Sequence, residues 1–197
     1  METSHSNRET ILNAIRSNVP KVPTEHPGIR TFQRPAGDLK AMFEQRPKEA
    51  GGAAHDLGSV PEAESKIILL HPDATVICSV VPEIAGTRRA ENVRDPHELA
   101  DVDVGVVRAQ FGVAESGAVW VTQEDLVVDA LGFLSQHLIV LLDPKQIVSD
   151  MHAAYRRVRL HETAFGCFMM GPSATADVEA TLVHGAQGAR SLNLFFL

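Results

Sequence analysis

The sequence is poor in cysteine, in positive charge and in long apolar runs. Its two cysteines, Cys78 and Cys167, form no Cys-x-x-Cys pair, so we expect no zinc site, iron–sulfur cluster or thioredoxin-type chemistry in this chain. Lys and Arg number 18 against 25 Asp and Glu, and the formal charge of −7 argues against nucleic-acid binding. No stretch approaches the roughly 18 consecutive apolar residues of a membrane span, and the N-terminus lacks the pattern of a secretory signal. We therefore expect a soluble, cytoplasmic protein.

The hydrophobic pattern divides the chain into two parts. Apolar residues at helical spacing predict helices over residues 8–18 and 38–46, with a proline-rich tether between them. We therefore assign residues 1–58 to a helical N-terminal arm. Strand-like and helical segments alternate over residues 59–197, which predicts one α/β domain with a mostly parallel sheet sandwiched by helices.

Seven apolar segments are expected to be strands. They lie at residues 75–81, 102–108, 111–113, 118–122, 137–142, 164–170 and 192–197. Their continuous apolar character predicts burial on both faces, and residues 144–157 are expected to form a crossover helix between two of them. Residues 110–122 instead predict a hairpin that turns at Glu115-Ser116-Gly117, laid into or beside the parallel sheet.

The segment after the 164–170 strand is a candidate anion site, because ligands bind at the carboxyl ends of parallel strands. Gly171 permits close approach of the backbone. Ser173 or Thr175 is expected to cap a following helix, which leaves free N–H groups for a carboxylate or a phosphate. The segment lacks the lysine of a Walker loop and the Gly-x-Gly-x-x-Gly spacing, so no nucleotide site is expected.

An alternative interpretation gives this segment no ligand. Ser173 is then only an N-cap, and Asp177 and Glu179 only complement the helix dipole. The expected helix also places His184 on the same face as Asp177, which makes His184 a further candidate. No second histidine one turn away and no third ligand accompany it, so no metal site is expected.

Glu115 is the candidate general base, because it is an acidic residue in a tight turn between two apolar strands. Ser116 beside it is included as a substrate-binding candidate, and Arg108 has the charge that an anionic substrate needs. Glu115 can equally serve only the turn, and Arg108 can be a solvated edge residue. His137 is interpreted as structural, because it begins its strand and ligands are expected at the opposite edge.

Three motifs together resemble the LUD-domain family, in its lactate-utilisation branch, over roughly residues 60–197. They are FGVAESG at residues 111–117, QHLIV at residues 136–140, and GPSxTADxE followed by VxGxxG at residues 171–188. The resemblance implies a NagB/RpiA/CoA-transferase-like fold and a role in bacterial oxidation of L-lactate to pyruvate. It also implies iron–sulfur clusters in two partner proteins, with no cofactor in this chain.

The resemblance also implies a set of site residues, namely the matching positions Glu115, Ser173, Thr175, Asp177 and Glu179. One departure affects the expected pocket. Family members usually have His-Gly-Pro where this chain has Gln187-Gly188-Ala189, which removes an imidazole.

Two hypotheses of function follow from these observations. In the first, the chain is a subunit of a lactate-utilisation system and binds a small carboxylate beside iron–sulfur partner proteins. The carboxylate then lies on the N–H groups after Gly171, while Glu115 accepts a hydrogen bond or a proton from the hydroxyl. In the second, it is a stand-alone isomerase-like or acyl-transferase-like enzyme, or a small-anion-binding protein without chemistry. Whether the isolated chain is an enzyme stays open at this point.

Overall fold

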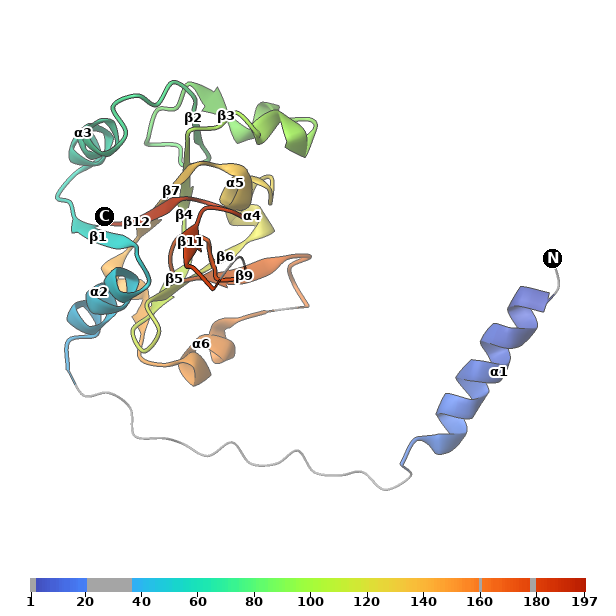
Figure 1. The fold of residues 1–197 in the computed structure, drawn as a ribbon. Coiled ribbons are helices and arrows are strands. Elements are labelled where there is room, and N and C mark those ends of the chain that lie inside the picture. The colour runs from blue at the N-terminus through green and yellow to red at the C-terminus, as the bar shows by residue number, and fades with distance from the viewer. Residues whose placement is uncertain (1–2, 21–36, 160, 178–179) are drawn as a thin grey trace. The chain divides into compact units, whose positions relative to one another are not determined.

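The computed structural model describes residues 3–20, 37–159, 161–177 and 180–197, and the chain divides into two compact units, residues 1–33 and 34–197 (Figure 1). The first unit contains α1 (Thr3–Asn18), so the helix predicted over residues 8–18 is confirmed. Ile11 and Ile15 of α1 are exposed. The other helices and strands that the structure describes belong to the second unit.

The second unit is built around a parallel sheet of six strands. They are β1 (Ala53–Asp56), β2 (Ile77–Ser79), β3 (Arg88–Arg89), β4 (Val104–Arg108), β7 (His137–Leu142) and β12 (Ser191–Phe196). Their order is β1-β12-β7-β4-β2-β3, and every neighbouring pair is parallel. The predicted parallel sheet is confirmed, and four of the predicted strand segments contribute to it.

Helices cover this sheet, namely α2 (Leu39–Glu49), α3 (Val60–Leu70), α4 (Gln123–Leu126) and α5 (Leu131–Leu134). A further helix, α6 (Met151–Arg157), packs on Phe111 and Trp120 instead. The 3-10 turns are η1 (Ala90–Asn92), η2 (Pro96–Leu99) and η3 (Pro144–Gln146). Ile139 of β7 packs with Ile67 of α3 on one face of the sheet. Leu138 joins the core around Phe43 of α2 on the other face. Both faces are buried, which explains why β7 is apolar at nearly every position.

α2 begins after Asp38, and the helix continues past Pro47 to residues that line the site described below. The Asp38 carboxylate accepts hydrogen bonds from the N–H groups of Lys40 and Ala41 and caps the helix start. The sequence predicts an end at residue 46, before Pro47, but Pro47 is buried inside the helix and the last turn continues to Glu49. This extra turn places Lys48 and Glu49 beside residues of the second half of the chain, in the wall of a cleft.

A second sheet has the order β8-β5-β6-β9. Its strands are β5 (Phe111–Val113), β6 (Ala118–Thr122), β8 (Ile147–Val148) and β9 (Gly166–Met169). β5 and β6 form the predicted hairpin, and β9 runs antiparallel to β6. The placement of the 164–170 segment in the parallel sheet is therefore wrong. Phe168 packs instead on Trp120 and Phe111, in an aromatic cluster that periodicity does not reveal.

Two helix predictions in the C-terminal half are also wrong. Residues 144–157 are not one crossover helix, because η3 and β8 precede the short α6, and β8 pairs with β5. Over residues 174–177 and 180–184, which the structure describes, no helix follows Ser173. β10 (Ala174–Thr175) and β11 (Val183–His184) form a small antiparallel ribbon there. The backbone of this segment bonds back to residues 185–189 across the ribbon, and those bonds replace the expected helical ones.

The predicted division into an arm and a domain at residue 58 stays a prediction. The structure adds that β1, which lies before residue 58, is an edge strand of the main sheet and pairs with β12. None of the helices described is long and apolar enough to cross a membrane.

Candidate functional site

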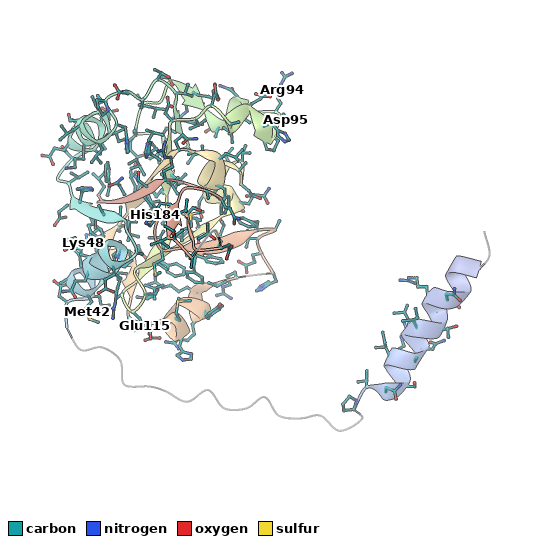
Figure 2. The ribbon with its side chains drawn as sticks, in the orientation of Figure 1. Met42, Lys48, Arg94, Asp95, Glu115 and His184 are labelled. Atoms are coloured by element: carbon teal, nitrogen blue, oxygen red, sulfur yellow. The ribbon has the colours of Figure 1, made fainter. Side chains whose placement is uncertain are left out.

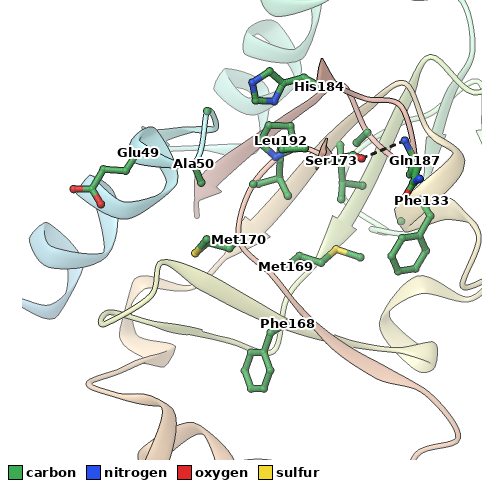
Figure 3. Close-up of a pocket in the computed structure, with 18 of the residues that line it drawn as sticks. Glu49, Ala50, Phe133, Phe168, Met169, Met170, Ser173, His184, Gln187 and Leu192 are labelled. Carbon is green, nitrogen blue, oxygen red and sulfur yellow. Dashed lines mark hydrogen bonds between the residues drawn. The ribbon is translucent and has the colours of Figure 1, made fainter. Parts of the chain in front are cut away.

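A cleft of about 710 Å³ lies between the main sheet, the end of α2, α5 and the loop that follows β9 (Figure 3). Its walls are formed by Lys48, Glu49, Ala50, Gly51, Gly132, Phe133, Leu138, Phe168, Met169, Met170, Gly171, Pro172, Ser173, Ala174, Leu182, His184, Gln187, Gly188, Ala189 and Leu192. Mainly apolar walls with a few polar groups are typical of sites for small ligands. The cleft is therefore the candidate site.

Two loops form one side of the cleft, and hydrogen bonds at Ser173 join them. The N–H of Ser173 donates to the carbonyl of Ala189, and its carbonyl accepts from the N–H of Gly185, both at 2.8 Å. Its Oγ accepts from the N–H of Gln187 at 3.3 Å (Figure 3). This acceptor role leaves the hydroxyl hydrogen of Ser173 available for a ligand.

The close packing of Gly171 against α2 completes that side. A Cβ at position 171 would lie 3.0 Å from both the Cβ and the carbonyl oxygen of Ala50, so a larger residue would push the loop away from the helix. Gly51 has a φ of +82°, and the ring of His184 lies directly over it. Glycine at these two positions lets the end of α2 and the ribbon approach each other.

The floor of the cleft is apolar. Leu138 and Leu192 on neighbouring strands of the main sheet are buried, and Met169 is partly buried against the same core. Phe133 and Met170 are 40% and 46% exposed, which is high for such large apolar side chains. A ligand with an apolar part would cover this surface.

The charged and polar groups of the cleft come from separate elements. Lys48 ends α2, and His184 lies on β11 (Figure 2). The ammonium of Lys48 has no ion-pair partner among the described residues, whereas Glu49 pairs with Arg46 at 3.0 Å and points away from Ser173 (Figure 3). The residues that line the cleft therefore include a lysine, a histidine and a serine, a set of side chains that suits a small anion.

Three of the predicted site residues, Gly171, Ser173 and His184, line this cleft. Glu115 and Ser116 line a smaller adjoining pocket of about 390 Å³, which shares Glu49, Ala50 and Met170 with the cleft. The Glu115 carboxylate accepts a hydrogen bond from the N–H of Met151 at 3.0 Å. Glu115 is thus beside the cleft and already serves the first turn of α6.

The other predicted residues lie elsewhere. Thr175 donates to Asp177 at 2.9 Å, and neither residue lines the cleft. Arg108 forms an ion pair with Glu83 at the carboxyl end of β4. Glu179 lies outside the described residues. The roles assigned to all these residues stay predictions.

Sequence reasoning missed Lys48 and did not foresee a role for Gln187 in contact with Ser173. Lys48 follows a proline that was expected to end its helix, so its sequence context gave no signal. Gln187 was singled out only as a departure from the family motif, and that departure now lies on the cleft wall. Within the described ranges no group of three or more His, Cys, Asp or Glu side chains is placed to hold a metal ion.

Comparison with protein families matches residues 52–197 to the LUD domain, which is well over half of the chain. The chain belongs to the LUD domain family. The family resemblance found in the sequence motifs is confirmed, and the cleft lies entirely within this LUD domain apart from the end of α2.

Two curated proteins are similar to parts of the chain. The lactate utilization protein C of Bacillus pumilus is 34% identical over 110 residues, which cover 53% of this chain and 45% of that protein. An uncharacterized protein of Neisseria meningitidis serogroup B is 30% identical over 97 residues, which cover 48% of this chain and 42% of that protein. The matches thus span less than half the length of these two relatives.

A solved structure supports the fold. The crystal structure of a DUF162 family protein from Deinococcus radiodurans superposes with a TM-score of 0.59 and 16% sequence identity. The superposition covers 80% of this chain and 95% of that protein. At this identity the likeness shows the fold of the LUD domain alone.

Proposed function

We propose that this LUD-domain protein is a subunit of a lactate-utilisation system and that its cleft binds the carboxylate of L-lactate. The family assignment and the similarity to a lactate utilization protein support the first part. The second part is supported by Lys48, which forms no ion pair with any described residue and lines the cleft together with Ser173 and His184. The position of Lys48 in this cleft is the observation that carries the proposal.

The way in which the cleft binds a carboxylate differs from what the sequence suggests. The N–H groups of Ser173, Gly185 and Gln187 already donate to protein acceptors, so this backbone is not free to receive an anion. Side chains take that role in the proposal, with Lys48 supplying charge and Ser173 supplying a directed hydroxyl. The apolar floor then receives the methyl group of lactate.

Oxidation of L-lactate to pyruvate releases two electrons and two protons. We propose that iron–sulfur clusters in partner proteins accept the electrons, as the family resemblance implies. Glu115, in the adjoining pocket, is the proposed acceptor of the hydroxyl proton, and the proton that leaves Cα passes to water. This chain would then bind and orient the substrate, and oxidation would need the assembled system.

Calorimetric titration of the full chain with L-lactate tests the binding step. Lys48→Met removes the cation and Ser173→Ala the hydroxyl, and each is expected to weaken binding by about tenfold, the effect of losing one charge-assisted or buried hydrogen bond. Lys145→Met, an exposed lysine on η3 outside the cleft, is the matched control and should bind as the wild type does. Equal affinity of the wild type and Lys48→Met for L-lactate would show that Lys48 does not bind the carboxylate and would contradict the proposed cleft.

Purification of the chain from its native host tests the assembly. The recovered material is assayed for iron and for lactate-dependent reduction of a dye. We expect iron-containing partners and activity to be recovered together, and activity to disappear when this chain is removed. Turnover of lactate by the isolated chain would contradict the subunit proposal and favour a stand-alone enzyme.

A further inference from the structure

A second cavity, of about 780 Å³, lies at the edge of the main sheet where the parallel strands begin. The residues that precede β4, β7 and β12, namely Asp103, Gln136 and Arg190, line it together with residues 70–74 after α3. It shares no lining residue with the cleft. This is the edge at which the sequence predicts no ligand.

Two histidines stack within this cavity. The rings of His71 and His137 lie 4.1 Å apart between centroids, with an interplanar angle of 24°. Nδ1 of His137 is hydrogen-bonded to the hydroxyl of Ser191 at 2.7 Å, but Nε2 of His71 is buried and has no hydrogen-bond partner. A buried polar atom without a partner is unfavourable by about 1–3 kcal/mol.

The surroundings lower the pKa values of both rings. Burial lowers the pKa of His71, and the charge that His137 can carry lowers it further. Burial also lowers the pKa of His137, and the Arg190 guanidinium adds to this effect while Asp103 opposes it. A charge of opposite sign placed near Arg190 would reverse part of this balance.

The acidic residues around the cavity are largely engaged. Asp101 binds Arg88 through two hydrogen bonds of 2.6 and 2.9 Å. One carboxylate oxygen of Asp103 accepts three hydrogen bonds, two from Thr75 and one from the N–H of Val76.

The remaining charged and titratable groups that face the histidines are few. Asp73 is exposed on the rim, and His55 is hydrogen-bonded to Asn193, a residue of the cavity wall. The Arg190 guanidinium has no ion-pair partner among the residues that the structure describes. The cavity wall thus combines a guanidinium that forms no ion pair with any described residue, two rings that can become cations, and carboxylates of which Asp101 and Asp103 already accept hydrogen bonds from the protein.

We propose that this cavity is a second binding site, separate from the lactate cleft, and that it takes a phosphate group with Arg190, His71 and His137 as its donors. A guanidinium offers paired N–H donors to phosphate oxygens, and each imidazolium adds a further donor. A tetrahedral phosphate has more acceptor oxygens than a carboxylate, so it satisfies three donor side chains better. The ligand is free phosphate or a small phosphate ester.

Binding at this site is coupled to uptake of protons. An anion on Arg190 offsets the charge that disfavours protonation of His137, and its oxygens stabilise the protonated rings. Affinity therefore rises as the pH falls from about 8 to about 6, the range in which histidine titrates. Phosphate itself gains a proton over this range, so sulfate, which does not, is the probe that isolates the titration of the protein.

Calorimetric titration of the full chain with sulfate and with inorganic phosphate at about pH 6 and pH 8 tests the proposal. We expect sulfate to bind at least about tenfold more tightly at the lower pH, which corresponds to about one pKa unit of coupling. Repeating the titration in buffers of different ionisation enthalpy counts the protons taken up. Affinity for sulfate that does not change with pH would overturn the proposal.

Arg190→Met and Arg94→Met form a matched pair of variants. Methionine keeps the part of the Arg190 side chain that packs on Gly185, so the fold is retained while the guanidinium is removed. Arg94 is exposed, lies outside the cavity, and sits far from Lys48 and Glu115 in Figure 2. Arg190→Met is expected to lose at least about tenfold in affinity for both anions, and Arg94→Met none. Equal losses in both variants would mean nonspecific charge attraction and would contradict the site.

The lactate proposal and the phosphate proposal can be contradicted independently of each other. Lys48→Met should weaken binding of L-lactate and leave sulfate binding unchanged, whereas Arg190→Met should do the reverse. Glycerol 3-phosphate distinguishes the two sources of the phosphate group. Tighter binding than that of inorganic phosphate identifies an ester as the ligand, and weaker binding identifies the free ion. Loss of lactate binding in Arg190→Met would show that the two cavities are not independent and would overturn the proposal of a separate site.

Discussion

Gly117, at the tip of the β5–β6 hairpin, lies directly against Arg46 of α2. A Cβ at position 117 would be 2.4 Å from the Cβ of Arg46 and 2.8 Å from the Cδ of Pro47. The φ of Gly117 is +71°, which other residues rarely adopt. This contact holds Glu115 beside the end of α2 that lines the cleft.

Gly117→Ala is expected to lower the free energy of unfolding by about 1–3 kcal/mol, because the added methyl combines backbone strain with a clash. Urea denaturation measures the loss. Gly58→Ala is the control, since a Cβ there would lie 3.4 Å from the nearest atom, a side-chain oxygen of Glu62, and should change stability less. Equal effects of the two substitutions would show that the hairpin tip is not packed on α2.

Gln187→His restores the imidazole that the family resemblance leads us to expect on the cleft wall. An imidazolium there adds positive charge near Ser173, so the variant should bind L-lactate about threefold to tenfold more tightly than the wild type at about pH 6 and equally well at pH 8. Calorimetry at the two pH values measures the difference. Gln45→His, on an exposed position of α2 outside the cleft, should show no such gain.

Glu115 has one observed role, as an acceptor at the start of α6, and one proposed role, as a base, and substitution can separate them. Glu115→Ala removes the acceptor for the N–H of Met151 and should lower stability by about 1 kcal/mol or less, as loss of a helix-start acceptor does. Glu115→Gln keeps an oxygen acceptor but cannot take a proton. Loss of lactate-dependent growth in the Gln variant, with an unchanged urea midpoint, is expected if Glu115 is the base. Normal growth of that variant would leave Glu115 with its structural role only.

The stacked histidines also make stability depend on pH. Their pKa values are lower in the folded than in the unfolded state, so the unfolded chain binds more protons below about pH 6.5. The free energy of unfolding should therefore fall as the pH drops through 6.5, in buffers without phosphate or sulfate. His71→Gln should flatten this dependence in urea titrations. His161→Gln, which changes an exposed residue outside the cavity, should leave it as in the wild type.

Strand predictions succeeded where the chain is apolar on both faces or turns sharply. The bounds of β5, β6 and β7 match the predicted segments to the residue. For β7, side chains alternate between two buried layers, so the strand follows the apolar run and ends before Asp143, which caps η3. For the hairpin, the Glu115-Ser116-Gly117 turn limits both strands.

Predictions failed where tertiary contacts overrode local preference. Ser173 can cap a helix, but its backbone bonds to Gly185 and Ala189 instead, and a ribbon forms. The segment that forms β9 was assigned to the wrong sheet because an apolar run does not indicate which strands it will pair with. Lys48 was missed because it reaches the cleft only through a helical turn that continues past Pro47.

The position of β12 between β1 and β7 has a consequence for how the molecule acquires its fold. His55 of β1 and Asn193 of β12, which are hydrogen-bonded, are separated by 138 positions in the chain. During synthesis β1 emerges long before β12, its neighbour in the sheet, so it stays without this partner until β12 has been made. Pairing strands that are so far apart in the sequence has a large entropy cost of loop closure, so we expect this part of the sheet to form slowly. In a cell, the nascent chain would thus present an open sheet edge to chaperones until β12 pairs with β1 and β7.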